Sequence, residues 1–411
     1  MVSAPRLEQR KRERLVVVGA GMAGLKLVEE LTELSPGRYD IVMIGREPRP
    51  AYNRVLLSGM LAGDAVESDI ELRPLAWYAE RGIELLTGVA CAALHPAERE
   101  VSLATGAPIA YDRLVLATGS TALRLPIRGH DLPGVLTFRD VDDVKAMQAV
   151  EPGAPAVVIG GGLLGVEAAH GLARRGCQVT LLHLMPRLME RQLDGRAAAL
   201  LEAAIAGKGI EVILEAQTAA IEGTSDGIER VVLKDGRVFP AATVVMAAGI
   251  RPATGLATTG GLAIGRGIKI DDALQTSAPD IYAIGECAEH CGQCCGLVEP
   301  AHEQAKVLAR RLCGLPARYE GSVAAASLKV SGVPVFSMGD FEGEGAETIL
   351  LEDAQAATYR KLVIRDGCLA GAVLFGDTTD SLWYRDLLRQ QAAIAPIRSG
   401  LAFGKAYAEA A

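Results

Sequence analysis

The sequence predicts an α/β protein that contains two copies of a strand–helix–strand unit and a smaller α+β domain near its C-terminal end. Two observations lead to this fold class. The pattern G-x-G-x-x-G occurs at residues 19–24 and 160–165, each time after a short apolar run. After about residue 322 the sequence changes to short alternating segments. Because the chain has 411 residues and 50% of them are hydrophobic, we expect two or three domains.

The first unit begins with the β-branched run at residues 15–18, which predicts a buried strand. Leucine and valine recur at helical spacing after the glycines, and the turn at 35–37 ends this helix. Residues 39–45 then supply the second strand. Together they make a βαβ unit of about thirty residues, the usual length for this unit. Residues 1–14 are basic and lack an apolar core, so we expect a solvated lead-in and no export signal.

The second unit repeats this order, with a strand at 156–159, a helix that ends near Gly176 and a strand at 178–182. Two further strand-like runs end in small residues, at 112–119 and 242–249. After each of these runs the chain could pass from one domain to the other. In the last part of the chain, Asp366-Gly367 separates two apolar runs and predicts a hairpin.

Composition excludes several classes of function. The net charge is −8 and aromatic residues make up 4% of the chain, so neither a cationic footprint nor a stacking surface for nucleic acid is expected. No run of about 18 or more apolar residues occurs, which argues against a membrane span. Eight cysteines are too few for a disulfide scaffold in a chain of this length. We therefore expect a soluble, cytoplasmic protein with reduced thiols.

The two glycine patterns carry the chemistry. The first glycine permits a tight turn, the second lets the backbone approach a pyrophosphate, and the third lets helix and strand pack closely. The helix N-terminus then offers free N–H groups to the anion. Two such sites imply two dinucleotides held together, which suits hydride transfer between a nicotinamide and a flavin. The predicted contacts are Gly19, Gly21 and Gly24 in the first copy, and Gly160, Gly162 and Gly165 in the second.

Residues beyond each turn refine this prediction. Glu47 follows the first unit and is our candidate for the adenosine ribose, although Arg46 departs from the usual pattern. The second unit ends in His183 instead of an acid, so either NADH or NADPH could serve; the alternative is an ordinary surface histidine. Glu167 lies two residues beyond the second pattern, and we place it near the nicotinamide; the alternative is an exposed helix carboxylate.

The chain resembles the FAD-dependent pyridine nucleotide oxidoreductases with two dinucleotide-binding domains, the class of glutathione reductase, rubredoxin reductase and dioxygenase ferredoxin reductases. The motifs that carry this resemblance are 19–24, 117–119, 160–165, 248–252 and 276–286. It implies two Rossmann-like domains in a glutathione-reductase-like arrangement. The expected boundaries are an FAD domain at 12–125 and 250–321, an NAD(P)H domain at 126–249 and the α+β domain at 322–411.

The resemblance also implies further contacts. Glu286 would bind the ribityl chain of FAD, and a helix that begins near Pro300 would point its N-terminus at the flavin. The remaining expected contacts are Arg54, Thr118, Gly119 and Gly285 for FAD, and Gly249 for NAD(P)H. Hydride transfer between stacked rings depends on orientation, so we assign no catalytic acid or base. We also assign no metal ligand.

A narrower resemblance, to the flavin module of assimilatory NAD(P)H nitrite reductase large subunits and to electron-transfer subunits of assimilatory nitrate reductase, rests on further runs. These runs are 48–58, 183–194, 321–323, 328–333 and 359–364. The chain stops at Ala411, where the sirohaem and iron–sulfur regions would follow. The resemblance implies a reductase component whose partner is a nitrate or nitrite reductase subunit or an iron–sulfur protein. Alternatives are a ferredoxin or rubredoxin reductase, or a non-catalytic sensor or assembly subunit.

Cysteines limit the mechanism. None occurs between Met1 and Val89, where disulfide reductases of this class carry a redox pair and where an oxidase or peroxidase would need a reactive thiol. Gly59 also stands where related ferredoxin reductases often place a lysine. Four cysteines gather after the last flavin motif, and metal ligation, redox activity and plain loop thiols stay open for them: Cys287, Cys291, Cys294 and Cys295. Donor preference, acceptor and oligomeric state also stay open.

Overall fold

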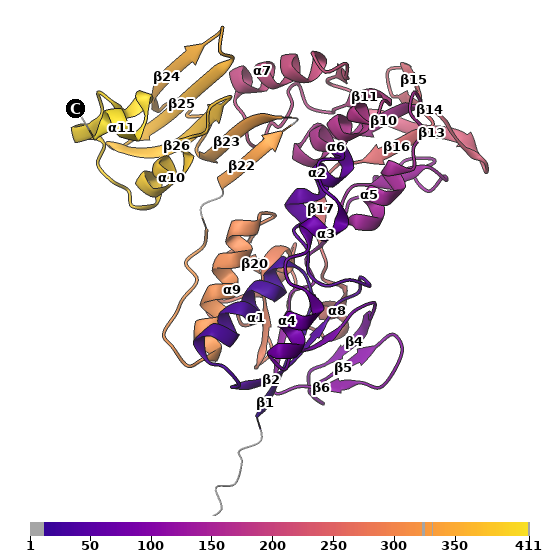
Figure 1. The fold of residues 1–411 in the computed structure, drawn as a ribbon, viewed down its shortest axis with the longest axis vertical. Coiled ribbons are helices and arrows are strands. Elements are labelled where there is room, and N and C mark those ends of the chain that lie inside the picture. The colour runs from indigo at the N-terminus through magenta and orange to yellow at the C-terminus, as the bar shows by residue number, and fades with distance from the viewer. Residues whose placement is uncertain (1–11, 323–324, 331, 410–411) are drawn as a thin grey trace, which may run out of the picture. The chain divides into compact units, whose positions relative to one another are not determined.

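The computed structural model describes residues 12–322, 325–330 and 332–409, which form two compact units (Figure 1). The first unit contains the described residues up to Asn53 together with Glu71–Thr121 and Arg251–Ser322. The second unit contains Arg54–Ile70, Ala122–Ile250 and the described residues after 322. Residues 54–70 therefore pack in the second unit, although the sequence analysis grouped them with residues 12–125. Residues 1–11 of the expected lead-in lie outside the described part of the chain.

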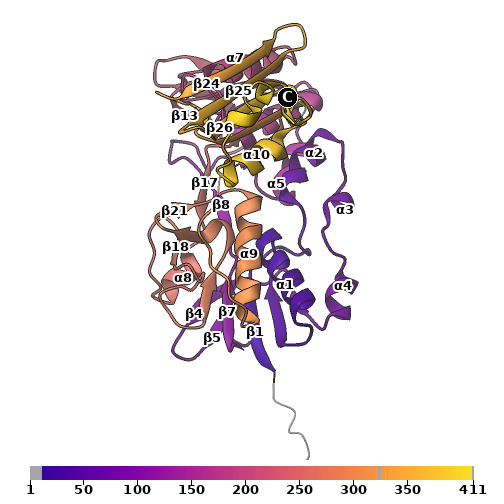
Figure 2. The same cartoon turned by 90° about the vertical axis from the view of Figure 1, so that its left-hand side faces the viewer.

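The first unit is built on a parallel sheet with the strand order β19-β7-β1-β2-β3. Val16 and Val17 of β1 are fully buried, as expected for a strand covered on both faces. Helices α1 and α9 lie side by side next to this sheet (Figure 1, Figure 2). The elements of this unit, with the two paired strands β8 and β17 at its borders, are β1 (Glu13–Val18), α1 (Met22–Leu34), β2 (Tyr39–Ile44), α4 (Leu75–Glu80), β3 (Glu84–Leu86), β4 (Cys91–His95), β5 (Glu100–Leu103), β6 (Ile109–Ala110), β7 (Arg113–Leu116), β8 (Ser120–Ala122), β17 (Ile250–Pro252), α8 (Gly255–Thr259), β18 (Ile268–Ile270), β19 (Ile281–Ala283), the 3-10 turn η2 (Gly285–Cys287), β20 (Ala288–His290), β21 (Gln293–Cys294) and α9 (Val298–Leu312).

The second unit contains a parallel sheet with the order β12-β11-β10-β16-β9 and an antiparallel sheet β13-β14-β15. Helix α2 packs closely on α6. Gly171 of α6 leaves room for Leu61 of α2, because a side chain at position 171 would collide with that leucine. The elements of this part are η1 (Arg54–Leu56), α2 (Leu57–Ala62), α3 (Glu67–Ile70), β9 (Val135–Thr137), α5 (Val141–Gln148), β10 (Pro155–Ile159), α6 (Leu163–Arg174), β11 (Gln178–Leu182), α7 (Gly195–Ala206), β12 (Glu211–Ile213), β13 (Thr218–Thr224), β14 (Gly227–Leu233), β15 (Val238–Pro240) and β16 (Thr243–Met246).

The C-terminal part of the second unit is an antiparallel sheet with the order β22-β23-β26-β25-β24. The predicted hairpin is confirmed: Asp366 and Gly367 connect β25 to β26, and both have positive φ, 49° and 73°. The elements are β22 (Ala325–Val330), β23 (Val333–Gly339), β24 (Glu347–Asp353), β25 (Thr358–Arg365), β26 (Cys368–Phe375), α10 (Ser381–Arg389), η3 (Ala395–Ile397), η4 (Leu401–Phe403) and α11 (Lys405–Ala408).

The fold class predicted from the sequence is confirmed, since two parallel α/β sheets are followed by a small α+β region. Each glycine pattern connects a central strand of its sheet to a helix, β1 to α1 and β10 to α6. Among the helices of the described residues, none combines the length and the apolar character needed to cross a membrane.

Candidate functional site

Each glycine turn opens a helix at the carboxyl end of a buried strand. Gly21 is the N-cap of α1 and Gly162 is the N-cap of α6. In these described segments, no side chain caps either helix, so N–H groups of the first turn stay available to a ligand. Aligned N–H groups and the helix dipole favour a phosphate at this position.

The glycines divide into two kinds. Gly19 and Gly160 have φ of 121°, and a side chain at either position would collide with the carbonyl of Ala117 or Ala247. Side chains at the third glycines, Gly24 and Gly165, would collide with the carbonyl oxygens of the first ones. Close packing inside the protein therefore explains these four glycines.

Gly21 and Gly162 differ from the other glycines of the two patterns. A Cβ atom at either one would meet no described protein atom within 4 Å. Their φ values, −100° and −76°, also suit any residue. Neither packing nor backbone conformation requires glycine there, whereas the close approach of a pyrophosphate would. Both turns therefore fit a dinucleotide.

Glu47 lies just beyond β2, at the carboxyl end of the first sheet, where an acid for the ribose was predicted. Its Oε2 accepts a hydrogen bond of 2.8 Å from the Tyr52 hydroxyl, and Arg49 lies 3.4 Å from the same oxygen. The neighbouring Arg46 is exposed. These contacts hold the half-buried Glu47 carboxylate near the carboxyl ends of β1 and β2, where the first glycine turn begins.

Two predicted flavin loops meet in the first unit. A Cβ atom on Gly119 would lie 3.8 Å from Oε2 of Glu286, and Ser120 donates a hydrogen bond of 2.8 Å to the same oxygen. Gly285, with φ of 78°, donates its N–H to Oε1 of the buried Gln304 on α9 at 2.7 Å. The structure thus brings the predicted contacts together and adds Ser120 and Gln304, which carried no motif signal.

Thr118 and Gly249 occupy the ends of the two strand-like runs. The Thr118 hydroxyl donates to the carbonyl of Ala253 at 2.8 Å, within the first unit. Gly249, with φ of 116°, accepts a hydrogen bond of 2.9 Å from the N–H of Leu123, within the second. Arg54 lies in the second unit and donates to the carbonyl of Arg139 at 2.8 Å. The structure therefore groups Arg54 with the second glycine turn, and not with the other residues predicted to contact FAD.

Glu167 is half-buried on α6, so the alternative of an exposed helix carboxylate is wrong. Burial raises the pKa of this carboxyl to about 7, although a hydrogen bond with Ser58 acts in the opposite direction. Ser58 belongs to α2, which packs on α6. Ser58 ends the run 48–58 that carries the narrower resemblance, and no role was predicted for it. A carboxyl group next to the turn thus changes its charge near neutral pH.

His183 is buried, with 7% of its surface exposed, so the alternative of a surface histidine is wrong. Its Nδ1 accepts a hydrogen bond of 2.9 Å from the N–H of Gly161, which places the ring proton on Nε2. Nε2 lies 3.1 Å from a carboxylate oxygen of Glu190. Both ring nitrogens therefore have hydrogen-bond partners, and His183 stabilises the second glycine turn through the N–H of Gly161. Glu190 carried no sequence signal apart from its place in a motif.

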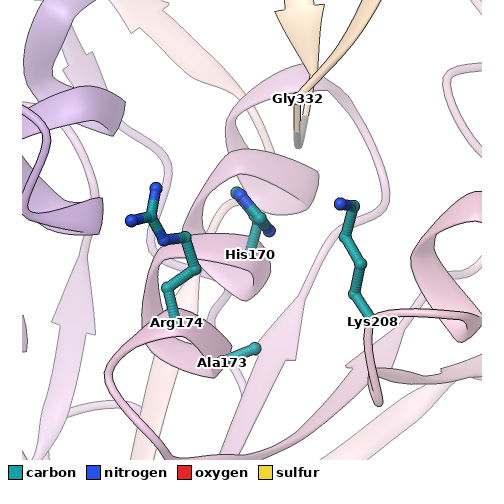
Figure 3. Close-up of a pocket in the computed structure, with 5 residues that line it drawn as sticks. All are labelled: His170, Ala173, Arg174, Lys208 and Gly332. Atoms are coloured by element: carbon teal, nitrogen blue, oxygen red, sulfur yellow. The ribbon is translucent and has the colours of Figure 1, made fainter.

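A basic cavity of about 470 Å³ lies at the other end of α6 (Figure 3). It is lined by His170, Ala173, Arg174, Lys208 and Gly332. Burial, Lys208 and Arg174 lower the pKa of His170. Arg174 forms an ion pair of 2.7 Å with Asp64. Because α6 rises about 1.5 Å per residue, this cavity is separate from the glycine turn at the helix N-terminus.

Comparisons with known proteins agree with this geometry. Residues 13–305 match the model of the pyridine nucleotide-disulphide oxidoreductase family, and residues 325–392 match that of the rubredoxin NAD+ reductase C-terminal domain. An NAD(P)H nitrite reductase of Bacillus subtilis is 45% identical over 387 residues, which cover 93% of this chain and 48% of that protein. The electron transfer subunit of assimilatory nitrate reductase from the same organism is 42% identical, covering 94% and 50%.

The chain thus spans about half the length of these curated relatives. In length, the chain agrees better with a solved structure than with these two relatives. The crystal structure of a ferredoxin reductase from Rhodopseudomonas palustris superposes with a TM-score of 0.85 at 26% identity. That match covers 93% of this chain and 96% of the other.

Proposed function

The chain belongs to the pyridine nucleotide-disulphide oxidoreductase family, and we propose that it is a reductase that takes hydride from NADH or NADPH onto FAD and passes electrons to a separate redox protein. The observation that carries this proposal is the pair of helix-opening turns whose middle glycines, Gly21 and Gly162, face open space. FAD, when bound, supplies the hydride-accepting and electron-releasing chemistry. The protein supplies binding and orientation.

In this proposal each unit binds one dinucleotide. The residues that hold FAD are Gly19, Gly21, Gly24, Glu47, Thr118, Gly119, Gly285 and Glu286 in the first unit. The residues that hold NAD(P)H are Gly160, Gly162, Gly165, Glu167, His183 and Gly249. No side chain serves as an acid or base in the hydride-transfer step, because hydride transfer depends on the orientation of the two rings. Glu167, on α6 just after the second glycine turn, would hold or release a proton at its carboxyl group near neutral pH.

We further propose that the acceptor is an assimilatory nitrate or nitrite reductase and that the reaction takes place in the cytoplasm. The two Bacillus subtilis relatives support this acceptor, because they are named as a nitrite reductase and as a nitrate reductase electron transfer subunit. Their similarity extends over more than nine-tenths of this chain.

The test is an anaerobic titration of the FAD-loaded protein with NADH and then NADPH. We expect one nucleotide to bleach the flavin bands completely. Gly162→Val should retain FAD and lose this reduction, because its side chain occupies the pyrophosphate path. Gly21→Val should be purified without FAD. A yellow Gly21→Val protein, or normal turnover by Gly162→Val, would contradict the assignment of the two turns.

A ferredoxin or rubredoxin reductase is the second candidate. The rubredoxin reductase C-terminal domain and the nearly complete coverage of a ferredoxin reductase structure favour it. Electron transfer to nitrate reductase, ferredoxin and rubredoxin, measured side by side with the same protein, distinguishes the candidates. If the protein oxidised no NAD(P)H with any of these acceptors, that result would favour a non-catalytic sensor or assembly subunit.

A further inference from the structure

The cysteine-rich segment after the last flavin motif forms a hairpin in the first unit. Strands β20 and β21 pair through His290 and Gln293, and Cys291 and Gly292 form the two-residue turn. Both turn residues have positive φ, 48° and 75°. Such turns favour asparagine, aspartate or glycine, so turn geometry does not account for a cysteine at position 291.

The turn places the Cys291 thiol beside two other groups that bind metals. One ligand atom each from Asp272, His290 and Cys291 lies within 4.8 Å of the others. Nε2 of His290 is 2.8 Å from a carboxylate oxygen of Asp272 and 3.8 Å from the Cys291 sulfur. The His290 side chain is only 10% exposed, whereas Cys291 is open to solvent. The three groups come from two segments that the fold brings together.

We propose that Asp272, His290 and Cys291 form a zinc site with one position open to solvent. Zinc binds oxygen, imidazole nitrogen and thiolate sulfur at about 2.0–2.3 Å in a tetrahedron, which separates the ligand atoms by about 3.3–3.6 Å. The distances of 2.8 Å and 3.8 Å need only a small adjustment to reach that geometry. A carboxylate and a thiolate together balance the charge of Zn²⁺, and borderline-soft nitrogen and sulfur ligands favour zinc over calcium or magnesium.

Neighbouring groups hold these ligands in position, as outer partners do in known zinc sites. Arg318 forms an ion pair of 2.7 Å with the second carboxylate oxygen of Asp272. The rings of Tyr319 and His290 pack edge-on, with their centroids 4.9 Å apart. The backbone N–H of Tyr319 donates a hydrogen bond of 2.9 Å to the backbone carbonyl of Asp272. A bound metal would therefore fasten the hairpin to the segment between β18 and β19, which Arg318 and Tyr319 hold in place.

In the described structure, the other three cysteines of the cluster do not belong to this group of ligand atoms. Cys287 is buried and lies 3.3 Å from the carbonyl oxygens of Leu116 and Ile284. Cys294 lies opposite Glu289 in the hairpin, and Cys295 lines a small cavity together with His290 and Gln304. The proposed site thus departs both from the expectation of no metal ligand and from a cluster made of four cysteines.

Metal binding at this site is not a redox step. A zinc–sulfur bond forms, the S–H bond of Cys291 breaks, and the proton leaves to solvent. His290 binds as neutral imidazole through Nε2, and Asp272 binds as the carboxylate.

The test uses the FAD-loaded protein after treatment with a chelator, with zinc as the probe. We expect one zinc ion per chain by elemental analysis after dialysis, and a competition assay gives the affinity. Cobalt should bind in its place and show tetrahedral d–d bands in the red, where oxidised flavin does not absorb. Zinc counted in this way is independent of turnover, so failure here and failure of the proposed function are distinguishable.

Matched variants locate the ligands. Cys291→Asn removes the sulfur but suits the turn, and we expect its zinc affinity to fall on the order of 100-fold with unchanged FAD content. Arg318→Gln should weaken binding about tenfold through Asp272. Cys294→Ser, in the same hairpin, should bind zinc like the unmodified protein. Absence of stoichiometric zinc, or equal affinity of Cys291→Asn and the parent protein, overturns the proposal, as does loss of zinc in Cys294→Ser.

Discussion

At the scale of single residues, Glu167 couples the second glycine turn to pH. Burial raises its pKa from the ordinary 4.5 to about 7, so the folded protein holds the proton more tightly than the unfolded chain does. The corresponding stability is complete below pH 4.5 and is lost as the pH rises through about 7.

Glu167→Gln should remove this dependence, because the amide does not ionise. Relative to the parent protein, the variant should gain stability as the pH rises from about 5 to about 8, by up to about 3 kcal/mol. Thermal unfolding of the FAD-loaded proteins at both pH values measures the difference.

Two variants of the same unit serve as comparisons. Ser58→Ala removes the hydrogen bond that lowers the pKa of Glu167, so the loss of stability should move to higher pH. Glu151→Gln changes an exposed carboxyl and should keep the parent profile. Parallel pH profiles for Glu167→Gln and the parent protein would show that Glu167 titrates normally.

His183 is the other residue whose role depends on its hydrogen bonds. Its Nδ1 accepts from the N–H of Gly161. His183→Asn places an acceptor oxygen near the position of Nδ1, whereas His183→Leu leaves that N–H buried without a partner, at a cost of about 1–3 kcal/mol.

We therefore expect His183→Leu to weaken NAD(P)H binding at least several-fold and to lower the unfolding temperature, while FAD content stays unchanged. His183→Asn should recover most of both properties. Equilibrium titration with NADH and NADPH and thermal unfolding measure them. If the leucine and asparagine variants behaved alike, the hydrogen bond to Gly161 would not matter.

At the scale of elements, each strand–turn–helix connection contains glycines that serve the protein and one that serves a ligand. A side chain at Gly24 would collide with the carbonyl oxygen of Gly19, whereas one at Gly21 would meet no described atom within 4 Å. The same sequence pattern therefore combines a folding requirement with a binding requirement.

This division predicts opposite effects for two small substitutions. Gly24→Ala should destabilise the first unit by about 1–3 kcal/mol or more, because it overpacks the helix against the turn. Gly21→Ala should change stability by less than about 1 kcal/mol and lower FAD affinity. Unfolding of the apoproteins and FAD titration separate the two effects. Equal destabilisation of both variants would contradict the division.

At the scale of the whole molecule, Asp194 is one of the residues that connect the C-terminal sheet to the rest of the second unit. Its Oδ1 caps α7 by accepting the N–H of Ala197 at 3.1 Å. Its Oδ2 accepts hydrogen bonds from the Tyr359 hydroxyl at 2.7 Å and the Lys361 ammonium at 3.1 Å. Burial and the carboxylate raise the pKa of Tyr359. One buried carboxylate thus serves both a helix and a sheet distant in sequence.

Asp194→Ala should therefore cost about 3–5 kcal/mol, because it removes the cap and leaves Lys361 without its ion-pair partner in a largely buried position. Tyr359→Phe removes a single hydrogen bond and should cost about 1 kcal/mol. Limited proteolysis of the segment after residue 322 and thermal unfolding test both values. Similar losses in the two variants would mean that Asp194 acts only through Tyr359.

Much of this molecule follows from the sequence because its signals are local. An apolar run, a glycine pattern and a helical repeat lie within about thirty residues of one another and together predict a βαβ unit. The fold class and the family predicted in this way are confirmed. Glycines 21 and 162 were also identified from their position in the pattern alone.

The tertiary structure decided the contacts between distant segments, because no local pattern encodes them. It placed Arg54 in the second unit, buried Glu167 next to Ser58 and joined His183 to Gly161. It also brought Asp272 to His290 and Cys291, whereas no metal ligand was predicted from the sequence. A side chain's charge and partners depend on which surfaces pack around it, and that packing exists only once the chain has folded.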